Sequence, residues 1–221
     1  MDKTQYTKLA KAWDYTEEHA RELEPADIAE ARAAADMAGL MQGPAAQAQL
    51  LGLLVRLTHA SSVIAVGTAS LVETMRLVAA LDGSGQLTAV DSTAQGITLI
   101  RKAFTQLQDT IDTSLRAVNA PASVFLPRLN ANDYDLIVVA GDAQNYAATY
   151  HQASRLLRQH GVIVFTNALA LDCASGGVVD AADRSERAVA MRELIAAVEE
   201  DDAFETALTP DGTGMLIAIK R

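Results

Sequence analysis

The amino-acid sequence predicts an α/β fold, in which a seven-stranded, mostly parallel sheet carries helices on both faces. Short apolar runs that read as strands alternate with longer segments of helical periodicity, the order expected for parallel strands joined by crossover helices. Near the end of the chain, two strand-like runs flank the turn sequence Pro210-Asp211-Gly212. That short connection indicates an antiparallel pair at one edge of the sheet.

The first sixty residues favour helices. Residues 28–38 are rich in alanine, which has the highest helix propensity. In residues 45–58, leucines recur at helical spacing. A chain of 221 residues is long for one small domain and short for two. We therefore expect one domain, with residues 1–60 as a helical cap on an α/β core of residues 61–221.

The remainder of the chain alternates between the two periodicities. Strands are expected at residues 62–66, 87–90, 114–118, 136–139, 162–165, 204–208 and 215–219. Helices are expected at residues 71–79, 97–107, 124–129, 146–158 and 182–198. The uninterrupted apolar run at 136–139 is typical of a strand that is buried on both faces.

Composition and charge exclude several classes of protein. Half of the residues are hydrophobic, which is enough for a sizeable core, and the formal net charge of −10 argues against a nucleic-acid-binding surface. The single cysteine, Cys173, cannot form an internal disulfide or a cysteine-based zinc site. No apolar run reaches membrane-spanning length, and the N-terminus lacks the apolar core of a signal peptide. We expect a cytoplasmic protein with no nucleic-acid or membrane partner.

Two residues at expected strand ends suggest a ligand. Gly67 follows the first strand, where a glycine permits close approach of a ligand, although an ordinary strand-to-helix turn explains it equally well. Asp91 ends the second strand, where a carboxylate can bind ribose hydroxyls or cap a helix. Together they suggest an adenosyl ligand, either a nicotinamide cofactor or S-adenosylmethionine (SAM). The absence of G-x-G-x-x-G and the closing hairpin disfavour the nicotinamide alternative.

Six segments follow one another in order from about residue 41 to residue 221: MQGPAAQAQLL, AVGTASLVETMRLVAAL, GQLTAVDS, YDLIVVAGDAQNY, LLRQHGVIVFTNALA and LTPDGTGMLIAIKR. Together they resemble the cation-dependent O-methyltransferase family, which includes the catechol and caffeoyl-CoA O-methyltransferases. The resemblance implies a Rossmann-like SAM-methyltransferase fold with an antiparallel terminal hairpin. It also implies SAM as the cofactor and S-adenosylhomocysteine (SAH) as the product.

The same resemblance implies five cofactor-binding positions. Gly67 and Thr68 would lie under the methionine part of SAM, and Asp91 would bind the ribose. Ala122 would lie beside the adenine, and Asp142 near the methionine end.

The chain departs from the family pattern within the cofactor motif. Ala65 replaces a glutamate, Leu71 replaces the second glycine, and Glu73 replaces the serine that helps to hold the SAM carboxylate. A carboxylate that faces another carboxylate is repulsive. The departures therefore predict weak cofactor binding.

The expected metal site differs even more from the family pattern. The family's three metal-ligand positions correspond to Ala140, Thr166 and Asn167, and its proposed basic lysine corresponds to Ala143. Magnesium requires hard, preferably anionic oxygen ligands, and the two anionic ligands of the family are missing at these positions. We expect no metal, and no reaction that depends on a metal-bound acceptor.

No catalytic residue is assigned. A histidine can act as a base near neutral pH, but the positions of the three later histidines favour surface roles: His59, His151 and His160. Asn145 and Tyr146 fall near the pocket, with packing the expected role of Tyr146. Cys173 falls in a loop that shapes the acceptor pocket in the family, but it has no evident activating partner.

The sequence therefore predicts a SAM-dependent O-methyltransferase that methylates an oxygen of a small-molecule acceptor without a metal. The alternative is a catalytically inactive protein of the same fold with a binding or regulatory role. We also expect a homodimer, since the family's bacterial members are typically homodimers. The apolar residues Leu50, Leu51, Leu54 and Leu57 offer an interface, although packing within the chain explains most of them.

Overall fold

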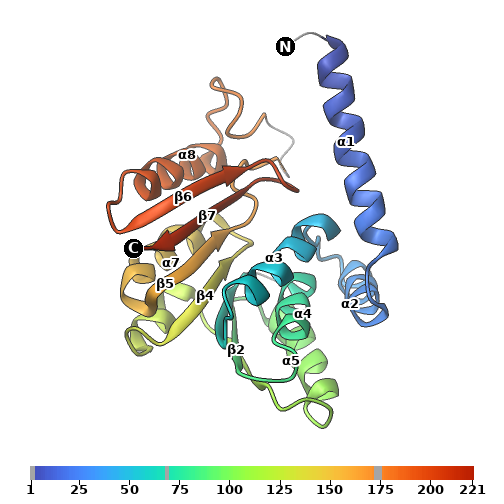
Figure 1. The fold of residues 1–221 in the computed structure, drawn as a ribbon, viewed down its shortest axis with the longest axis vertical. Helices are drawn as coiled ribbons and strands as arrows, with labels where there is room; N and C mark the ends of the chain where they lie inside the picture. The colour runs from blue at the N-terminus through green and yellow to red at the C-terminus, as the bar shows by residue number, and fades with distance from the viewer. Residues whose placement is uncertain (1–2, 68–69, 172–175) are drawn as a thin grey trace.

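A computed structural model of the chain describes residues 3–67, 70–171 and 176–221 (Figure 1). Its helices are α1 Lys3–Glu22, α2 Ala26–Met37, α3 Ala45–Leu57, α4 Leu71–Ala80, α5 Ala94–Leu107, α6 Ala122–Phe125, the 3-10 turn η1 Leu126–Arg128, α7 Ala143–Leu156 and α8 Glu186–Glu199. Its strands are β1 Ser62–Val66, β2 Gln86–Asp91, β3 Ser114–Asn119, β4 Tyr134–Val139, β5 Leu157–Phe165, β6 Phe204–Thr209 and β7 Met215–Lys220. Each expected strand is present.

The seven strands form one sheet in the order β3-β2-β1-β4-β5-β7-β6. The first five are parallel, whereas β7 runs antiparallel to both β5 and β6. The predicted antiparallel ending is therefore confirmed, with β7 inserted between its hairpin partner and the parallel strands. The strand order reverses between β1 and β4, and such a switch point opens a crevice at the carboxyl ends of the strands.

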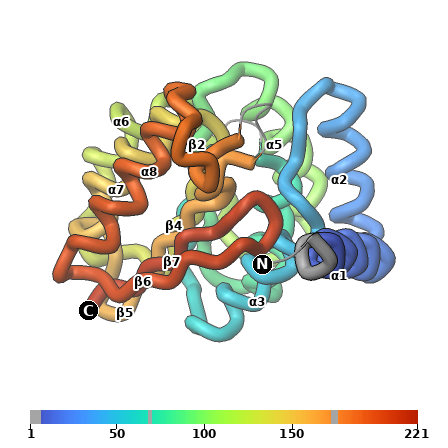
Figure 2. Tube along the Cα trace, turned by 90° about the horizontal axis from the view of Figure 1, so that it is seen from above, coloured from blue at the N-terminus to red at the C-terminus, as the bar shows by residue number. Residues whose placement is uncertain are grey.

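Both faces of the sheet are covered by helices, because successive side chains of a strand point to opposite faces. In β1, Val63 and Ala65 pack in the core shared with α2, α3, α4 and α5, whereas Ile64 and Val66 pack in the core shared with α6, α7 and α8. Figure 2 shows these two helical groups on opposite sides of the sheet. The uninterrupted apolar composition of the central strands follows from this double burial.

Several boundaries differ from the sequence-based prediction, and two of the differences have a clear local cause. The helix expected at 182–198 begins at Glu186, because the Ser185 hydroxyl caps it by accepting a hydrogen bond from the Ala188 N–H at 3.4 Å. The helix expected to reach residue 158 ends at Leu156, because Leu157 already pairs with Tyr134 of β4. Pairing between strands overrides the helical periodicity there.

The N-terminal helices pack against one side of the core, and α1 extends away from it (Figure 1). Leu51 is fully buried and Leu50 and Leu54 are partly buried within the chain, so packing explains three of the four leucines proposed for an interface. Leu57 is exposed. Among the residues that the structure describes, no helix has the length and apolar character needed to cross a membrane.

Candidate functional site

A cavity of about 280 Å³ lies at the carboxyl ends of the central strands. Its wall combines the loop before α3, the start of α4, the loops after β4 and β5, and the start of α8. The lining residues are Met41, Gln42, Gly43, Pro44, Gln47, Ser70, Glu73, Ala140, Gly141, Asp142, Thr166, Asn167, Arg187 and Thr213. This is the crevice that the switch point between β1 and β4 predicts.

The turn after β1 packs against the ends of β2 and β4. Gly67 donates its N–H to the Val90 carbonyl at 3.1 Å, and Ala140 donates to the Val66 carbonyl at 2.7 Å. A Cβ at Gly67 would lie 2.6 Å from the Ser70 hydroxyl oxygen and 3.0 Å from the Ala140 Cβ. Glycine at this position thus lets the β1 and β4 ends pack closely beside α4. Thr68, the neighbouring predicted contact, lies outside the described residues.

Asp91 is buried at the end of β2, with 1% of its surface exposed. Its Oδ1 accepts hydrogen bonds from the Thr93 N–H at 2.7 Å and from the Thr93 hydroxyl at 2.8 Å. Thr93 in turn caps α5 by accepting from the Gly96 N–H at 3.1 Å. Asp91 therefore braces the turn that leads from the carboxyl end of β2 into α5.

The remaining two predicted cofactor positions lie on the same edge of the sheet. Ala122 is buried at the start of α6, beyond the end of β3. Asp142 is exposed, lines the cavity and occupies the cap position before α7. Asp142 therefore lines the cavity together with Ser70 of the turn after β1. Asp91 lies at the end of β2, and Ala122 lies beyond the end of β3.

Glu73 lines the cavity from the first turn of α4, with 4% of its surface exposed. Its Oε1 accepts a hydrogen bond from the Gly43 N–H at 3.2 Å. Its Oε2 is buried and has no hydrogen-bond partner among the described residues. Burial raises the pKa of Glu73, although a hydrogen bond from its own backbone N–H, the charge of Arg32 and the Gly43 N–H oppose the shift.

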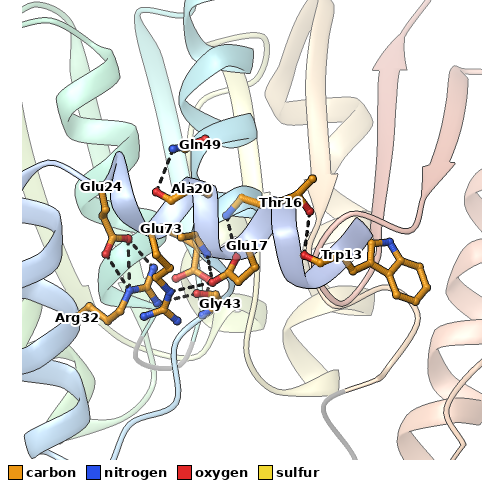
Figure 3. A network of polar contacts seen from close by, with 12 residues as sticks. Trp13, Thr16, Glu17, Ala20, Glu24, Arg32, Gly43, Gln49 and Glu73 are labelled. Atoms are coloured by element: carbon orange, nitrogen blue, oxygen red, sulfur yellow. Dashed lines mark hydrogen bonds and ion pairs between the residues drawn. The ribbon is translucent and has the colours of Figure 1, made fainter. Parts of the chain in front are cut away.

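A buried polar network connects this glutamate to the N-terminal helices (Figure 3). Arg32 of α2 forms an ion pair with Glu24 at 2.7 Å and donates to the Gly43 carbonyl at 2.8 Å. The Gly43 N–H is the group that donates to Glu73. Glu17 of α1 accepts from the Ala45 and Ala46 N–H groups, at 2.9 and 3.1 Å. The cavity wall at residue 43 is therefore positioned by side chains of three different helices.

The positions that correspond to the family's metal ligands also converge on the cavity. Ala140 offers no side-chain donor, and the Thr166 hydroxyl donates to the Val139 carbonyl at 3.1 Å. The Asn167 Oδ1 is buried and makes no hydrogen bond within the described part of the chain. No cluster of three or more His, Cys, Asp or Glu suited to a metal occurs among the described residues. One amide oxygen beside one carboxylate, Asp142, does not fit the ligand set that magnesium requires.

Arg187 is a cavity residue that the sequence-based reasoning missed. Its guanidinium donates to the Gly141 carbonyl at 2.9 Å and to the Tyr146 hydroxyl at 3.4 Å. It also lies over the Tyr146 ring, with 5.6 Å between Cζ and the ring centroid. Arg187 thus brings a positive charge to the cavity wall that also contains Thr166 and Asn167. The sequence of α8 carries no motif that indicates this position.

The other candidates have structural roles. Tyr146 is fully buried and donates to the Thr166 carbonyl at 2.8 Å, which confirms its expected packing role. Asn145 is buried and donates to the Ala140 carbonyl at 3.3 Å, so it supports the cavity wall. All three later histidines are exposed, and none lines the cavity. Cys173 lies outside the described residues.

Comparison with known proteins places this geometry in context. Residues 17–221 match a family model described as O-methyltransferase. A protein of Mycobacterium sp. (strain JLS), whose name assigns it to the O-methyltransferases, is 31% identical over 198 residues, which are 89% of this chain and 87% of that protein.

Solved structures of low sequence identity share the fold. The O-methyltransferase from Bacillus cereus in complex with SAH is 17% identical and has a TM-score of 0.77, covering 96% of this chain and 99% of that one. The O-methyltransferase TomG from Streptomyces achromogenes in complex with SAM is 18% identical and also has a TM-score of 0.77, covering 95% and 97%. The described fold is therefore that of a SAM-methyltransferase.

Proposed function

The chain belongs to the O-methyltransferase family, and on that premise we propose that it transfers the methyl group of SAM to an oxygen of a small-molecule acceptor. The observation that carries the proposal is the cavity at the β1–β4 switch point, whose wall includes Glu73 and Asp142. Asp91 ends the neighbouring strand β2. SAM supplies an electrophilic methyl group when bound. The protein's task is then to hold the adenosyl group and to bring the acceptor oxygen into line.

The described residues fit the cofactor at both ends. We propose that Asp91 accepts hydrogen bonds from the ribose, as a carboxylate at the end of the second strand does in dinucleotide-binding sheets. The cavity beside Gly67 has room for an amino-acid group, and its wall includes Asp142 as a partner for an ammonium. These are the contacts that we propose for cofactor binding, together with Thr68 and Ala122.

We propose that catalysis does not use a metal ion. The support is the mismatch between the donor set around Ala140, Thr166 and Asn167 and the requirements of magnesium. Arg187 offers a fixed positive charge next to these positions. A guanidinium there would favour an acceptor whose reacting oxygen is acidic, such as a phenol, because it stabilises the oxyanion that attacks the methyl group.

We further propose that the protein acts in the cytoplasm as a homodimer. The supporting observation is a set of apolar side chains on α1 that remain exposed in the single chain. They include Leu9, Trp13 and Tyr15, which are 44%, 50% and 67% exposed. A second copy of the chain would cover such a surface in a symmetric pair.

Calorimetric titration with SAM and SAH, with and without magnesium, tests the proposed function. Binding of both, unchanged by magnesium, followed by methylation of at least one member of a panel of phenols, supports a metal-independent O-methyltransferase. Binding without methylation of any acceptor would favour the non-catalytic alternative. Failure to bind either compound would refute the proposed function.

A further inference from the structure

We propose that the chain binds a small phosphomonoester at a second site, between α3 and α4, through the guanidinium groups of Arg56 and Arg76. The site is a cavity of about 240 Å³. None of its lining residues lines the candidate cofactor cavity. The inference therefore goes beyond the proposed methyl transfer and does not depend on it.

The close approach of α3 and α4 brings the two arginines to one cavity (Figure 1). In α3, Gly52 and Arg56 lie one helical turn apart and share a helix face. A Cβ at Gly52 would lie 3.2 Å from the Arg76 Nε and 3.7 Å from the Ala80 Cβ. The side chain of Arg76 thus lies against the backbone of α3, and both arginines line the space between the helices.

Arg76 differs from the other arginines that the fold removes from solvent. Each of the others that is buried or partly buried among the described residues donates to a carboxylate or a carbonyl: Arg32, Arg155, Arg158, Arg187 and Arg192. Arg76 is partly buried and makes no hydrogen bond or ion pair with any described residue. Burial of an unpaired charge is unfavourable, so an anion bound at Arg76 would stabilise this arrangement.

Arg56 adds a second cation that has no partner within the described part of the chain. It lies in the last turn of α3, where the helix dipole favours a positive charge, whereas Arg76 does not lie in the last turn of α4. The dipole therefore accounts for Arg56 by itself but not for the pairing of both arginines on one cavity.

The wall of this cavity includes no acidic residue among those described, although the chain carries a formal net charge of −10. Glu24 lies with Arg76 along a small neighbouring void, but both oxygens of Glu24 accept hydrogen bonds from Arg32. Two cations that face one cavity repel each other, and an anion between them removes that repulsion. The charge balance of the cavity therefore calls for an anionic ligand.

The chemistry of the wall indicates the class of anion. Guanidinium groups form paired, charge-assisted hydrogen bonds with phosphate oxygens. A phosphomonoester carries about two negative charges above neutral pH, which matches two arginines, whereas a carboxylate carries one. Pro25, Leu53 and Ala79 supply an apolar part of the wall for the esterified group. Leu53 and Ala79 are exposed, so a soluble ligand can enter.

Calorimetric titration of the full chain with phenyl phosphate at about pH 8, where a phosphomonoester is a dianion, tests the site. The control ligand is benzenesulfonate, a monoanion that carries the same ring, and sodium chloride keeps the ionic strength constant. Inorganic phosphate is titrated in parallel, because it lacks the ring that the apolar wall would contact.

Two kinds of variant locate the ligand. Arg56→Gln and Arg76→Gln each remove one cation. Ala79→Glu keeps both arginines but adds a carboxylate to the cavity wall, whereas Ala79→Gln adds a side chain of the same size without the charge. The matched control for the loss of an arginine is Arg128→Gln, at an exposed position of η1 across the sheet from α3 and α4.

We expect phenyl phosphate to bind the native chain, Ala79→Gln and Arg128→Gln alike, and at least about tenfold more tightly than benzenesulfonate. Arg56→Gln, Arg76→Gln and Ala79→Glu should each weaken its binding by at least about tenfold. Inorganic phosphate should show the same losses in these three variants.

No binding of phenyl phosphate by the native chain would overturn the inference. Equal affinity for phenyl phosphate and benzenesulfonate, or affinity that is unchanged in either arginine variant, would overturn it as well. Thermal melting of each variant shows whether it is folded, and if Arg76→Gln is not, Ala79→Glu at its exposed position decides the outcome. These results leave the proposed function intact, because SAH binding is measured separately.

Discussion

Replacement of Asp91 tests whether this buried carboxylate binds the cofactor or only braces its own turn. In the structure, one oxygen of Asp91 accepts two hydrogen bonds from Thr93, whose hydroxyl caps α5. Asp91→Asn preserves an acceptor oxygen for Thr93 but removes the negative charge and replaces the second oxygen by an amide NH₂. Asp91→Ala removes both functions. The two variants therefore separate ligand binding from local stability.

The expected magnitude follows from the bonds at stake. Hydrogen bonds to a charged group contribute about 1.5–3 kcal/mol each, and incomplete loss of such bonds in Asp91→Asn leaves a penalty of about 1–3 kcal/mol. This corresponds to a loss of SAH affinity of about 5- to 150-fold. Asp91→Ala should lose at least as much affinity and should also lower the free energy of unfolding by about 1–2 kcal/mol, because the cap at Thr93 loses its support.

The assay combines calorimetric titration with SAH and urea denaturation of the free protein. Asp109→Asn, at an exposed position after α5, is the matched control and should change neither quantity. Unchanged SAH affinity in both Asp91 variants would refute the reasoning and reduce Asp91 to a structural residue of the α5 turn.

Three further predictions follow from the same structure. Glu17→Ala should lower the free energy of unfolding by about 1–2 kcal/mol and Tm by about 2–8 °C, because Glu17 of α1 caps α3, whereas exposed Glu18→Ala should be neutral in the same thermal melts. Despite burial, hydrogen bonds from the α3 N–H groups and Arg21 lower the pKa of Glu17. The contribution of Glu17 to the free energy of unfolding is therefore complete above the ordinary glutamate range and is lost as the pH falls through the lowered pKa. Thermal melts of Glu17→Ala and the native chain should therefore converge at acid pH. Methyl transfer should continue in the presence of EDTA, and activity that EDTA abolishes and magnesium restores would contradict the metal-independent mechanism. Arg187→Met should reduce the rate of methyl transfer at least tenfold and leave SAH affinity unchanged. Light scattering should give about twice the 23.4 kDa chain mass, and deletion of residues 1–24 should shift the protein towards monomer, whereas a full-length monomer at tens of micromolar would contradict the dimer.

The sequence by itself determined the architecture. The alternation of strand and helix periodicities depends on local spacing, and the uninterrupted apolar runs of central strands such as β1 and β4 reflect burial on both faces of the sheet. The short turn around Gly212 likewise indicated the antiparallel ending, since the turn chemistry is local. Strand ends also mark ligand sites, so Gly67 and Asp91 could be selected before any contact was known, whereas Asp142 was selected through the family resemblance.

Only the tertiary structure decided the chemistry of the cavity. The sequence marks Glu73 only as a departure from the family motif, whereas its contacts involve Gly43, thirty residues away, and Arg32 of another helix. Arg187 reaches the Gly141 carbonyl across 46 residues of sequence. Burial, partner and charge state are properties of contacts between distant segments, and they control whether a carboxyl group is ionised and where a guanidinium lies. Periodicity and motif spacing carry no information about those contacts, which is why the sequence could not show that Glu73 is buried and bonded to Gly43.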